Sequence, residues 1–168
     1  MRRLQHPLAD DADPCQHLAV SDRGPASPSH DLMDIDSTFL PVGQMRQIAR
    51  VTRLAEGQID ADVDLGPHHW VFSQHFPGDP IFPGTLIIEA AGQLVALFAW
   101  AQGQRGRPRL VKTSAEFHSP VGPTASHLQL RAEVRSRKHI HFATIEVWAA
   151  ETHAATVTAV LAVLPAGS

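Results

Sequence analysis

This sequence has one cysteine and a small net charge, and each of these excludes a class of protein. One of its 168 residues is cysteine, Cys15, so no disulfide can form within the chain, which is compatible with a reducing cytoplasm. The formal net charge is −3 and the isoelectric point is about 6.4. A chain without a basic field gives no indication of nucleic acid or an anionic membrane as a partner.

Long hydrophobic runs are scarce as well. The N-terminal sequence MRRLQHPLADDADP has two arginines but no apolar stretch behind them, so it lacks the pattern of a secretory signal. The most hydrophobic run, Leu86 to Ala101, is shorter than the ~20 residues of a membrane span and contains Glu89 and Gln93. The sequence therefore predicts one soluble, cytoplasmic domain with no membrane partner.

Residues 1–36 are rich in Asp, Pro, Ser and His, with few apolar side chains. Such a segment buries too little surface to offset the entropy of ordering it, so we expect a flexible tail. A docking arm for a partner remains the alternative. The tail precedes a domain that we place at residues 37–165.

Apolar alternation predicts strands on both sides of one helix. Residues 44–54 alternate loosely and residues 58–65 clearly, which indicates a strand pair with one solvated face. The segments with strand character after the helix are 109–118, 128–134, 140–149 and 155–164, with a hairpin turn at Lys138. The aromatic residues Trp100, Phe142 and Trp148 are expected in the core. The class is α+β, a long buried helix wrapped by an antiparallel sheet of five or six strands.

The stretch from His75 to Gln93, HFPGDPIFPGTLIIEAAGQ, organises the chain. The prolines and glycines of its first half favour turns, and Pro83 prevents a helix from continuing through this half. The helix then extends from about Thr85 to Ala101. Glu89 and Gln93 lie four residues apart and so share one face of an otherwise apolar rod. A carboxylate in such a place costs several kcal/mol unless it is paired, protonated or wetted, which favours a chemical role.

This stretch resembles the active-site segment of the hotdog-fold 3-hydroxyacyl-acyl carrier protein dehydratases, the FabZ/FabA family. His75 and Glu89 are 14 positions apart, which is the family's spacing between its catalytic histidine and its acidic residue. A weaker likeness continues from Glu116 to Val121. The residues that carry the pattern are His75, Phe76, Pro77, Gly78, Pro80, Pro83, Gly84, Glu89, Ala90 and Gln93.

The resemblance implies a hotdog fold and a homodimer, with a trimer of dimers as the larger form. The two catalytic residues of one site would come from different subunits. It also implies an acyl carrier protein that delivers a phosphopantetheine-linked substrate, and an apolar tunnel beside the helix. No metal and no organic cofactor is expected.

Removing water from a 3-hydroxyacyl thioester requires a base, an acid and a group that holds charge on the thioester oxygen. A neutral His75 suits the base, because imidazole titrates near neutral pH. Glu89 suits the acid if burial keeps it protonated. The backbone N–H groups of Gly84 and Thr85, at the helix N-terminus, could polarise the carbonyl. Gln93 could orient the carboxyl or the released water.

Three departures from the family pattern leave substrate choice and gating open. Leu40-Pro41 is followed by Val-Gly-Gln in place of the usual His-Arg-x-Pro-Phe run, and Pro123-Thr124-Ala125 replaces a Pro-Gly-Asp. Many relatives gate their tunnel with a tyrosine, and this chain has none. These loops and the tail favour a specialised pathway, such as polyketide-type synthesis.

Other functions remain as alternatives. Within enzymes these are a dehydratase that also isomerises the double bond, or a thioesterase. Outside them it is a non-catalytic acyl-binding subunit that pairs with an active homologue. A metal site is disfavoured, because neither His68-His69 nor the pair His139 and His141 has a carboxylate or cysteine set at ligand spacing.

Overall fold

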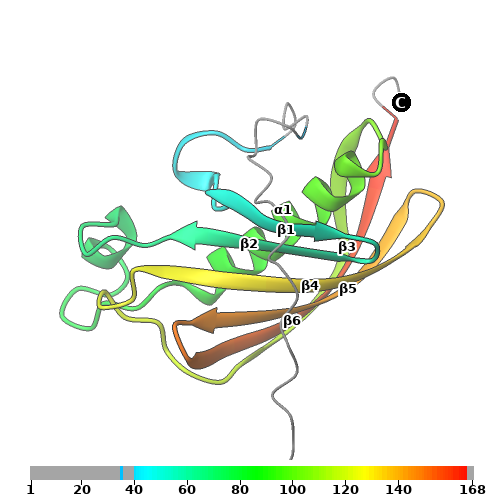
Figure 1. The fold of residues 1–168 in the computed structure, drawn as a ribbon. Coiled ribbons are helices and arrows are strands. Elements are labelled where there is room, and N and C mark those ends of the chain that lie inside the picture. The colour runs from blue at the N-terminus through cyan, green and yellow to red at the C-terminus, as the bar shows by residue number, and fades with distance from the viewer. Residues whose placement is uncertain (1–34, 36–39, 166–168) are drawn as a thin grey trace, which may run out of the picture.

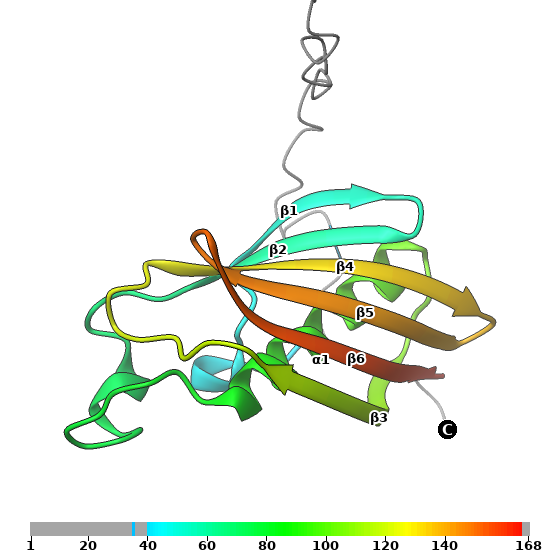
Figure 2. The same ribbon diagram turned by 90° about the horizontal axis from the view of Figure 1, so that it is seen from below.

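The structure, a computed structural model, describes Ile35 and residues 40–165. Within these residues six antiparallel strands form one sheet, and a single long helix packs against one of its faces (Figure 1). The strands lie side by side in the order β1-β2-β4-β5-β6-β3 (Figure 2). The elements are β1 (Arg50–Ala55), β2 (Gln58–Asp64), α1 (Gly84–Ala101), β3 (Arg107–Phe117), β4 (His127–Arg137), β5 (Ile140–Ala149) and β6 (Thr152–Leu164), with short 3-10 turns at Gly43–Met45 and Trp70–Ser73.

This arrangement confirms the predicted α+β class and the wrapped helix. Lys138 has φ 56° at the β4–β5 hairpin, as expected for a turn residue. The first strand is shorter than predicted: it begins at Arg50, and a 3-10 turn at Gly43–Met45 and an irregular segment precede it. The predicted tail lies outside the described residues except for Ile35, whose side chain is buried in the core.

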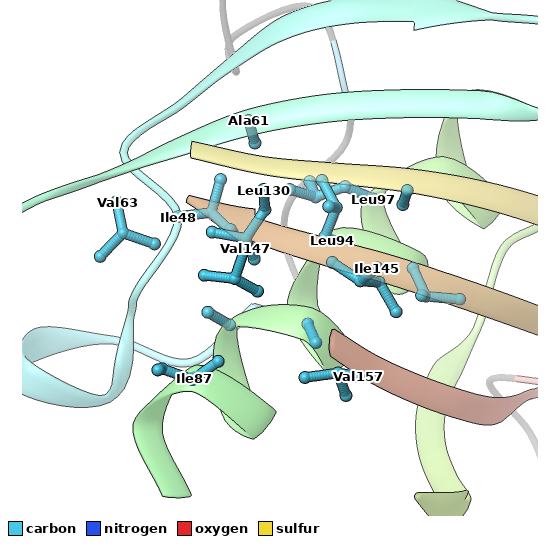
Figure 3. Close-up of a cluster of buried hydrophobic side chains, with 14 of the residues drawn as sticks. Ile48, Ala61, Val63, Ile87, Leu94, Leu97, Leu130, Ile145, Val147 and Val157 are labelled. Carbon is cyan, nitrogen blue, oxygen red and sulfur yellow. The ribbon is translucent and has the colours of Figure 1, made fainter. Parts of the chain in front are cut away.

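The core lies between α1 and the inner face of the sheet (Figure 3). Alternate side chains of β4, β5 and β6, such as Leu130, Ile145 and Val157, meet Leu94 and Leu97 of the helix. The helix is apolar on nearly every side because the sheet curves around it. In the described part of the chain, α1 is long and apolar enough to cross a membrane, with mean hydropathy 1.5, and 61% of it is buried inside the protein.

The outer face of the sheet corrects two expectations. Phe142 is 47% exposed and Trp148 lies on the same outer face, so only Trp100 of the three expected core aromatics is a core residue. The reason is the period of β5, which turns Ala143, Ile145 and Val147 inward. Trp148 instead stacks on His153, with ring centroids 4.6 Å apart.

Asp62 on β2 is also not solvated as the strand alternation predicted. It is 7% exposed and forms a 2.6 Å ion pair with Arg50 of β1. The ion pair with Arg50 therefore replaces water at this position.

Candidate active site

His75 follows the Trp70–Ser73 turn and opens a tight turn of its own. The amide nitrogens of Phe76 and Asp79 each lie 3.0 Å from the other residue's carbonyl oxygen. Gly78 has φ +87°, which a type II turn requires at its third position, and Pro77 supplies the preferred second position. The Phe-Pro-Gly part of the motif therefore reverses the chain direction directly after the histidine.

The imidazole of His75 is oriented by the other limb of this loop. Its Nδ1 lies 3.2 Å from the carbonyl oxygen of Ile81, and the Ile81 N–H donates to the His75 carbonyl at 2.8 Å. Because a carbonyl oxygen only accepts, this contact assigns the proton to Nδ1 and leaves the lone pair of Nε2 available. Phe76 stacks on the ring at a centroid distance of 3.8 Å. The histidine is half-buried and its arrangement suits a base.

The start of α1 is a confined helix N-terminus. Pro83 caps the helix and is buried, and its carbonyl accepts from Leu86 N at 3.0 Å. The first N–H groups of a helix, here those of Gly84 and Thr85, have no intrahelical acceptor and can donate to an anion. The ring of Phe117 on β3 covers Gly84 so closely that a Cβ there would lie 2.5 Å from it. A side chain at position 84 would therefore require the Phe117 ring to move.

Glu89 is held by the side-chain amide of Gln93, one turn further along α1. Gln93 Nε2 donates to Glu89 Oε1 at 2.8 Å and to the carbonyl of Met45 at 2.7 Å. Its Oε1 accepts from the backbone N–H of Gln47 at 2.9 Å and from that of Ile48 at 3.3 Å. All four hydrogen-bonding positions of this buried amide are used. The segment before β1 therefore fixes the amide, and the amide fixes one carboxyl oxygen of Glu89.

A cleft of about 390 Å³ opens beside Glu89. Most of its lining residues are small or apolar, among them Leu40, Pro41, Gly92, Ala96 and Leu161. Arg107 and Arg109, at the start of β3, line it as well. An apolar cleft with one convergent carboxyl and amide pair is the usual form of a small-molecule site.

The structure brings together some of the predicted site residues and not others. Glu89 and Gln93 share the cleft, whereas His75 does not line it. His75, Phe76, Pro77 and Gly78 form the separate turn, and Pro83, Gly84 and Thr85 form the helix start between the two. The residues that sequence reasoning missed are Phe117, Ile81 and the segment 45–48. Two of these act through backbone atoms, which leave no trace in side-chain identity.

His69 lies on the same loop as His75 but is part of its packing. Its ring contacts Trp70, Phe72 and Phe82, and its Nδ1 accepts from the Val71 N–H at 3.4 Å. Burial lowers the pKa of His69, which keeps it a neutral acceptor. No group of three or more His, Cys, Asp or Glu residues placed to hold a metal ion occurs within residues 40–165.

Comparison with known proteins gives a family match and several neighbours in fold. The sequence model of the family described as FabA-like domain matches residues 40–158. The dehydratase heterocomplex ApeI:P from Xenorhabdus doucetiae is similar in fold, with a TM-score of 0.63, 14% identity, and coverage of 77% of this chain and 90% of that one. A thioesterase from Haemophilus influenzae has a TM-score of 0.56 at 16% identity, covering 71% of this chain and 80% of its own. At these identities the structural likenesses establish the hotdog fold alone.

Proposed function

The chain belongs to the FabA-like domain family, and we propose that it dehydrates (3R)-3-hydroxyacyl thioesters on an acyl carrier protein to trans-2-enoyl thioesters. The pathway would be fatty-acid or polyketide-type biosynthesis. The observation that carries the proposal is the carboxyl of Glu89 in an apolar cleft. The side-chain amide of Gln93, whose hydrogen-bonding positions are all used, orients this carboxyl. The dehydratase heterocomplex among the fold neighbours supports the same reaction class.

In this reaction Nε2 of His75 removes a proton from the carbon next to the thioester carbonyl. Glu89 delivers a proton to the departing 3-hydroxyl, so that the C–O bond breaks and water leaves. The N–H groups of Gly84 and Thr85 stabilise the negative charge that develops on the thioester oxygen. Gln93 holds one carboxyl oxygen, which leaves the other to face the substrate. No step requires a metal or an organic cofactor.

The active unit in this proposal is a homodimer, in which His75 of one subunit faces Glu89 of its partner. Two features support it. His75 does not line the cleft that Glu89 occupies within one chain. Strand β3 lies at the edge of the sheet and exposes Leu110 (45%), Val111 (65%) and Phe117 (53%), which is a surface that a second copy can cover by strand pairing. A trimer of such dimers remains a prediction, as does a cytoplasmic location.

Two alternatives have specific support. The thioesterase among the fold neighbours favours hydrolysis of the thioester, in which Glu89 would activate water instead of protonating a hydroxyl. The heterocomplex among them favours a role as one subunit of a mixed dehydratase, acyl-binding or catalytic. The thioesterase releases a free thiol, whereas the dehydratase loses water and keeps the thioester bond. An isomerase activity would add a shifted double bond to the same product.

The test is to incubate the protein with a panel of 3-hydroxyacyl carrier proteins of different chain length and to follow the acyl mass. The proposal expects loss of one water by the wild type and much slower loss by His75→Ala and Glu89→Gln. Release of free thiol without loss of water would support the thioesterase. A wild-type protein that is folded, dimeric and inert across the panel would contradict the enzyme and favour the partner-subunit role.

A further inference from the structure

The body of α1 contains a glycine at its one open position. From Ala90 to Trp100 every residue of the helix is buried except Gly92, which is half-buried and lines the Glu89 cleft. After proline, glycine is the least favourable residue inside a helix. The glycine therefore weakens the helix at the position where the helix meets the cleft, and helix formation does not account for it.

Close packing within the chain does not account for Gly92 either. Apart from its own turn of the helix, a Cβ built at Gly92 would have no atom of the described residues within 4 Å. Gly84 is the contrast, because a Cβ there would lie 2.5 Å from the Phe117 ring. Gly92 is also in the helix with ordinary φ, unlike the positive-φ glycines of the described turns. An alanine would thus fit the backbone here, and its methyl group would occupy the cleft.

Gly92 lies between two other cleft residues on the same face of α1. Glu89, Gly92 and Ala96 follow one another at intervals of three and four residues, and all three line the cleft together with Leu161 of β6. At 1.5 Å per residue, Gly92 is ~4.5 Å and Ala96 ~10.5 Å beyond Glu89 along the helix axis. Along this face the cleft lining therefore changes from a carboxyl to bare backbone and then to a methyl group.

We propose that Gly92 determines which acyl chains the Glu89 site accepts, by leaving room for the chain to pass directly over the helix backbone. This inference rests on the proposed function, in which Glu89 protonates the hydroxyl on carbon 3 of the substrate. The carbons beyond carbon 3 then lie at Gly92 and, in longer chains, at Ala96. The preferred substrates are 3-hydroxyacyl chains long enough to reach Ala96. Gly92 is a specificity-determining residue, whereas Glu89 is the catalytic one.

Filling the space at Gly92 tests the inference through chain length. We expect Gly92→Leu to lower kcat/KM for a 3-hydroxydodecanoyl carrier protein about tenfold more than for a 3-hydroxybutyryl one, because a misfit of one methylene in an apolar pocket already changes rates by about tenfold or more. Gly92→Ala should shift the ratio in the same direction by less, and it should fold at least as stably as the wild type. The matched control is Gln102→Leu, at the exposed end of the same helix, which should keep the wild-type ratio.

A binding measurement separates this inference from the proposed reaction, because it needs no catalysis. The probe is the amide analogue of dodecanoyl-pantetheine, titrated into the full-length protein in a calorimeter. The wild type and Gln102→Leu should bind it alike, and Gly92→Leu about tenfold more weakly. This result with a wild type that dehydrates no substrate would contradict the dehydratase and still support the role of Gly92.

Three results would overturn the inference. The first is equal affinity of the wild type and Gly92→Leu for the probe, or no binding by the wild type. The second is an equal loss of activity on the short and the long chain. The third is a Gly92→Leu protein that elutes as a monomer beside a dimeric wild type, because the space at Gly92 would then be filled by a second copy of the chain.

Discussion

The two halves of the candidate site are built differently. His75 lies on an exposed turn and is oriented by one carbonyl, that of Ile81, within a loop closed by backbone hydrogen bonds. Glu89 lies on the central helix and is oriented by Gln93, whose amide is buried and bonded at all four positions to groups as far as 48 residues away. The His75 half is held by contacts within one exposed loop, whereas the Glu89 half is held by hydrogen bonds to distant parts of the chain.

Because of this difference, substitutions in the two halves should have different effects on the free energy of unfolding. Removing a side chain from the open turn takes away one hydrogen bond, which contributes about 1 kcal/mol. Removing the amide from the helix leaves buried donors and acceptors without partners. The same reaction would therefore depend on two residues whose neighbours have very different effects on the free energy of unfolding.

The largest expected effect is on activity at His75. We expect His75→Ala to lower the rate of water loss from a 3-hydroxyacyl carrier protein by about 10²–10⁴-fold, the usual contribution of a general base. Its free energy of unfolding should fall by only about 1 kcal/mol. Steady-state kinetics and urea denaturation of the same preparation measure both. If His75→Ala lost its activity because it unfolded, the proposed difference between the two halves would be contradicted.

The next effect is on stability at Gln93. Gln93→Leu leaves the Gln47 N–H and the Met45 carbonyl without their partners, at roughly 1–3 kcal/mol for each buried group. We expect the free energy of unfolding to fall by about 3 kcal/mol, measured in urea. Gln102→Leu, at the exposed C-terminal end of the same helix, is the control and should change it by less than about 0.5 kcal/mol. Equal losses in both variants would contradict the proposed network.

Acid should weaken both ends of the molecule through the partly buried His69 and the fully buried His141. Burial lowers the pKa of His69, beside the His75 turn. It also lowers the pKa of His141, with a smaller contribution from His139. His141 is neutral in the fold, since the Gln104 amide oxygen only accepts from Nε2 and Ser136 is placed to donate to Nδ1.

The sign follows from proton binding. Histidine in the unfolded chain has a pKa of about 6.5, and below this pH the unfolded chain binds protons that the folded chain excludes. The stabilisation is therefore complete above pH 6.5 and decreases as the pH falls below it. One group contributes a slope of at most ~1.4 kcal/mol per pH unit. Urea denaturation from pH 7.5 to 5 should show a smaller slope in His141→Gln and in His69→Gln. The exposed His68→Gln should keep the wild-type slope; if all three match the wild type, burial is not the cause.

The smallest effect is at the helix start between the two halves. Gly84→Ala adds a Cβ 2.5 Å from the Phe117 ring, but this ring is half-exposed and can move. We expect a loss of about 1 kcal/mol in unfolding free energy, at the low end for overpacking. In a double-mutant cycle, Gly84→Ala should cost nothing when Phe117→Ala has already removed the ring. A loss that persists without the ring would place the strain in the backbone.

Much of the fold could be predicted from the sequence because two periods were clear. The apolar run after Pro83 identified the helix to within one residue, and β5 was predicted with the bounds it has. Prediction failed at three individual side chains within these strands. Phe142 and Trp148 are apolar by composition yet lie on the open face, and Asp62 is acidic yet buried against Arg50.

The candidate site was only partly accessible to the same reasoning. The spacing of Glu89 and Gln93 predicted that they share a helix face, and the structure shows the hydrogen bond between them. The contacts that orient them come from carbonyls and amides of Met45, Gln47, Ile48 and Ile81. Backbone groups are present at every residue, so no pattern of side chains reveals which of them are used. The roles of His75 and Glu89 stay predictions.

One measurement tests the central claim most directly, that a dimer assembles each site from His75 of one subunit and Glu89 of the other. Inactive His75→Ala and Glu89→Gln proteins are mixed in equal amounts, unfolded, refolded together and assayed for water loss. Random pairing makes half of the dimers mixed, and each mixed dimer has one intact site, so we predict about a quarter of wild-type activity. A mixture as inactive as its components, beside an active refolded wild type, would contradict the shared site.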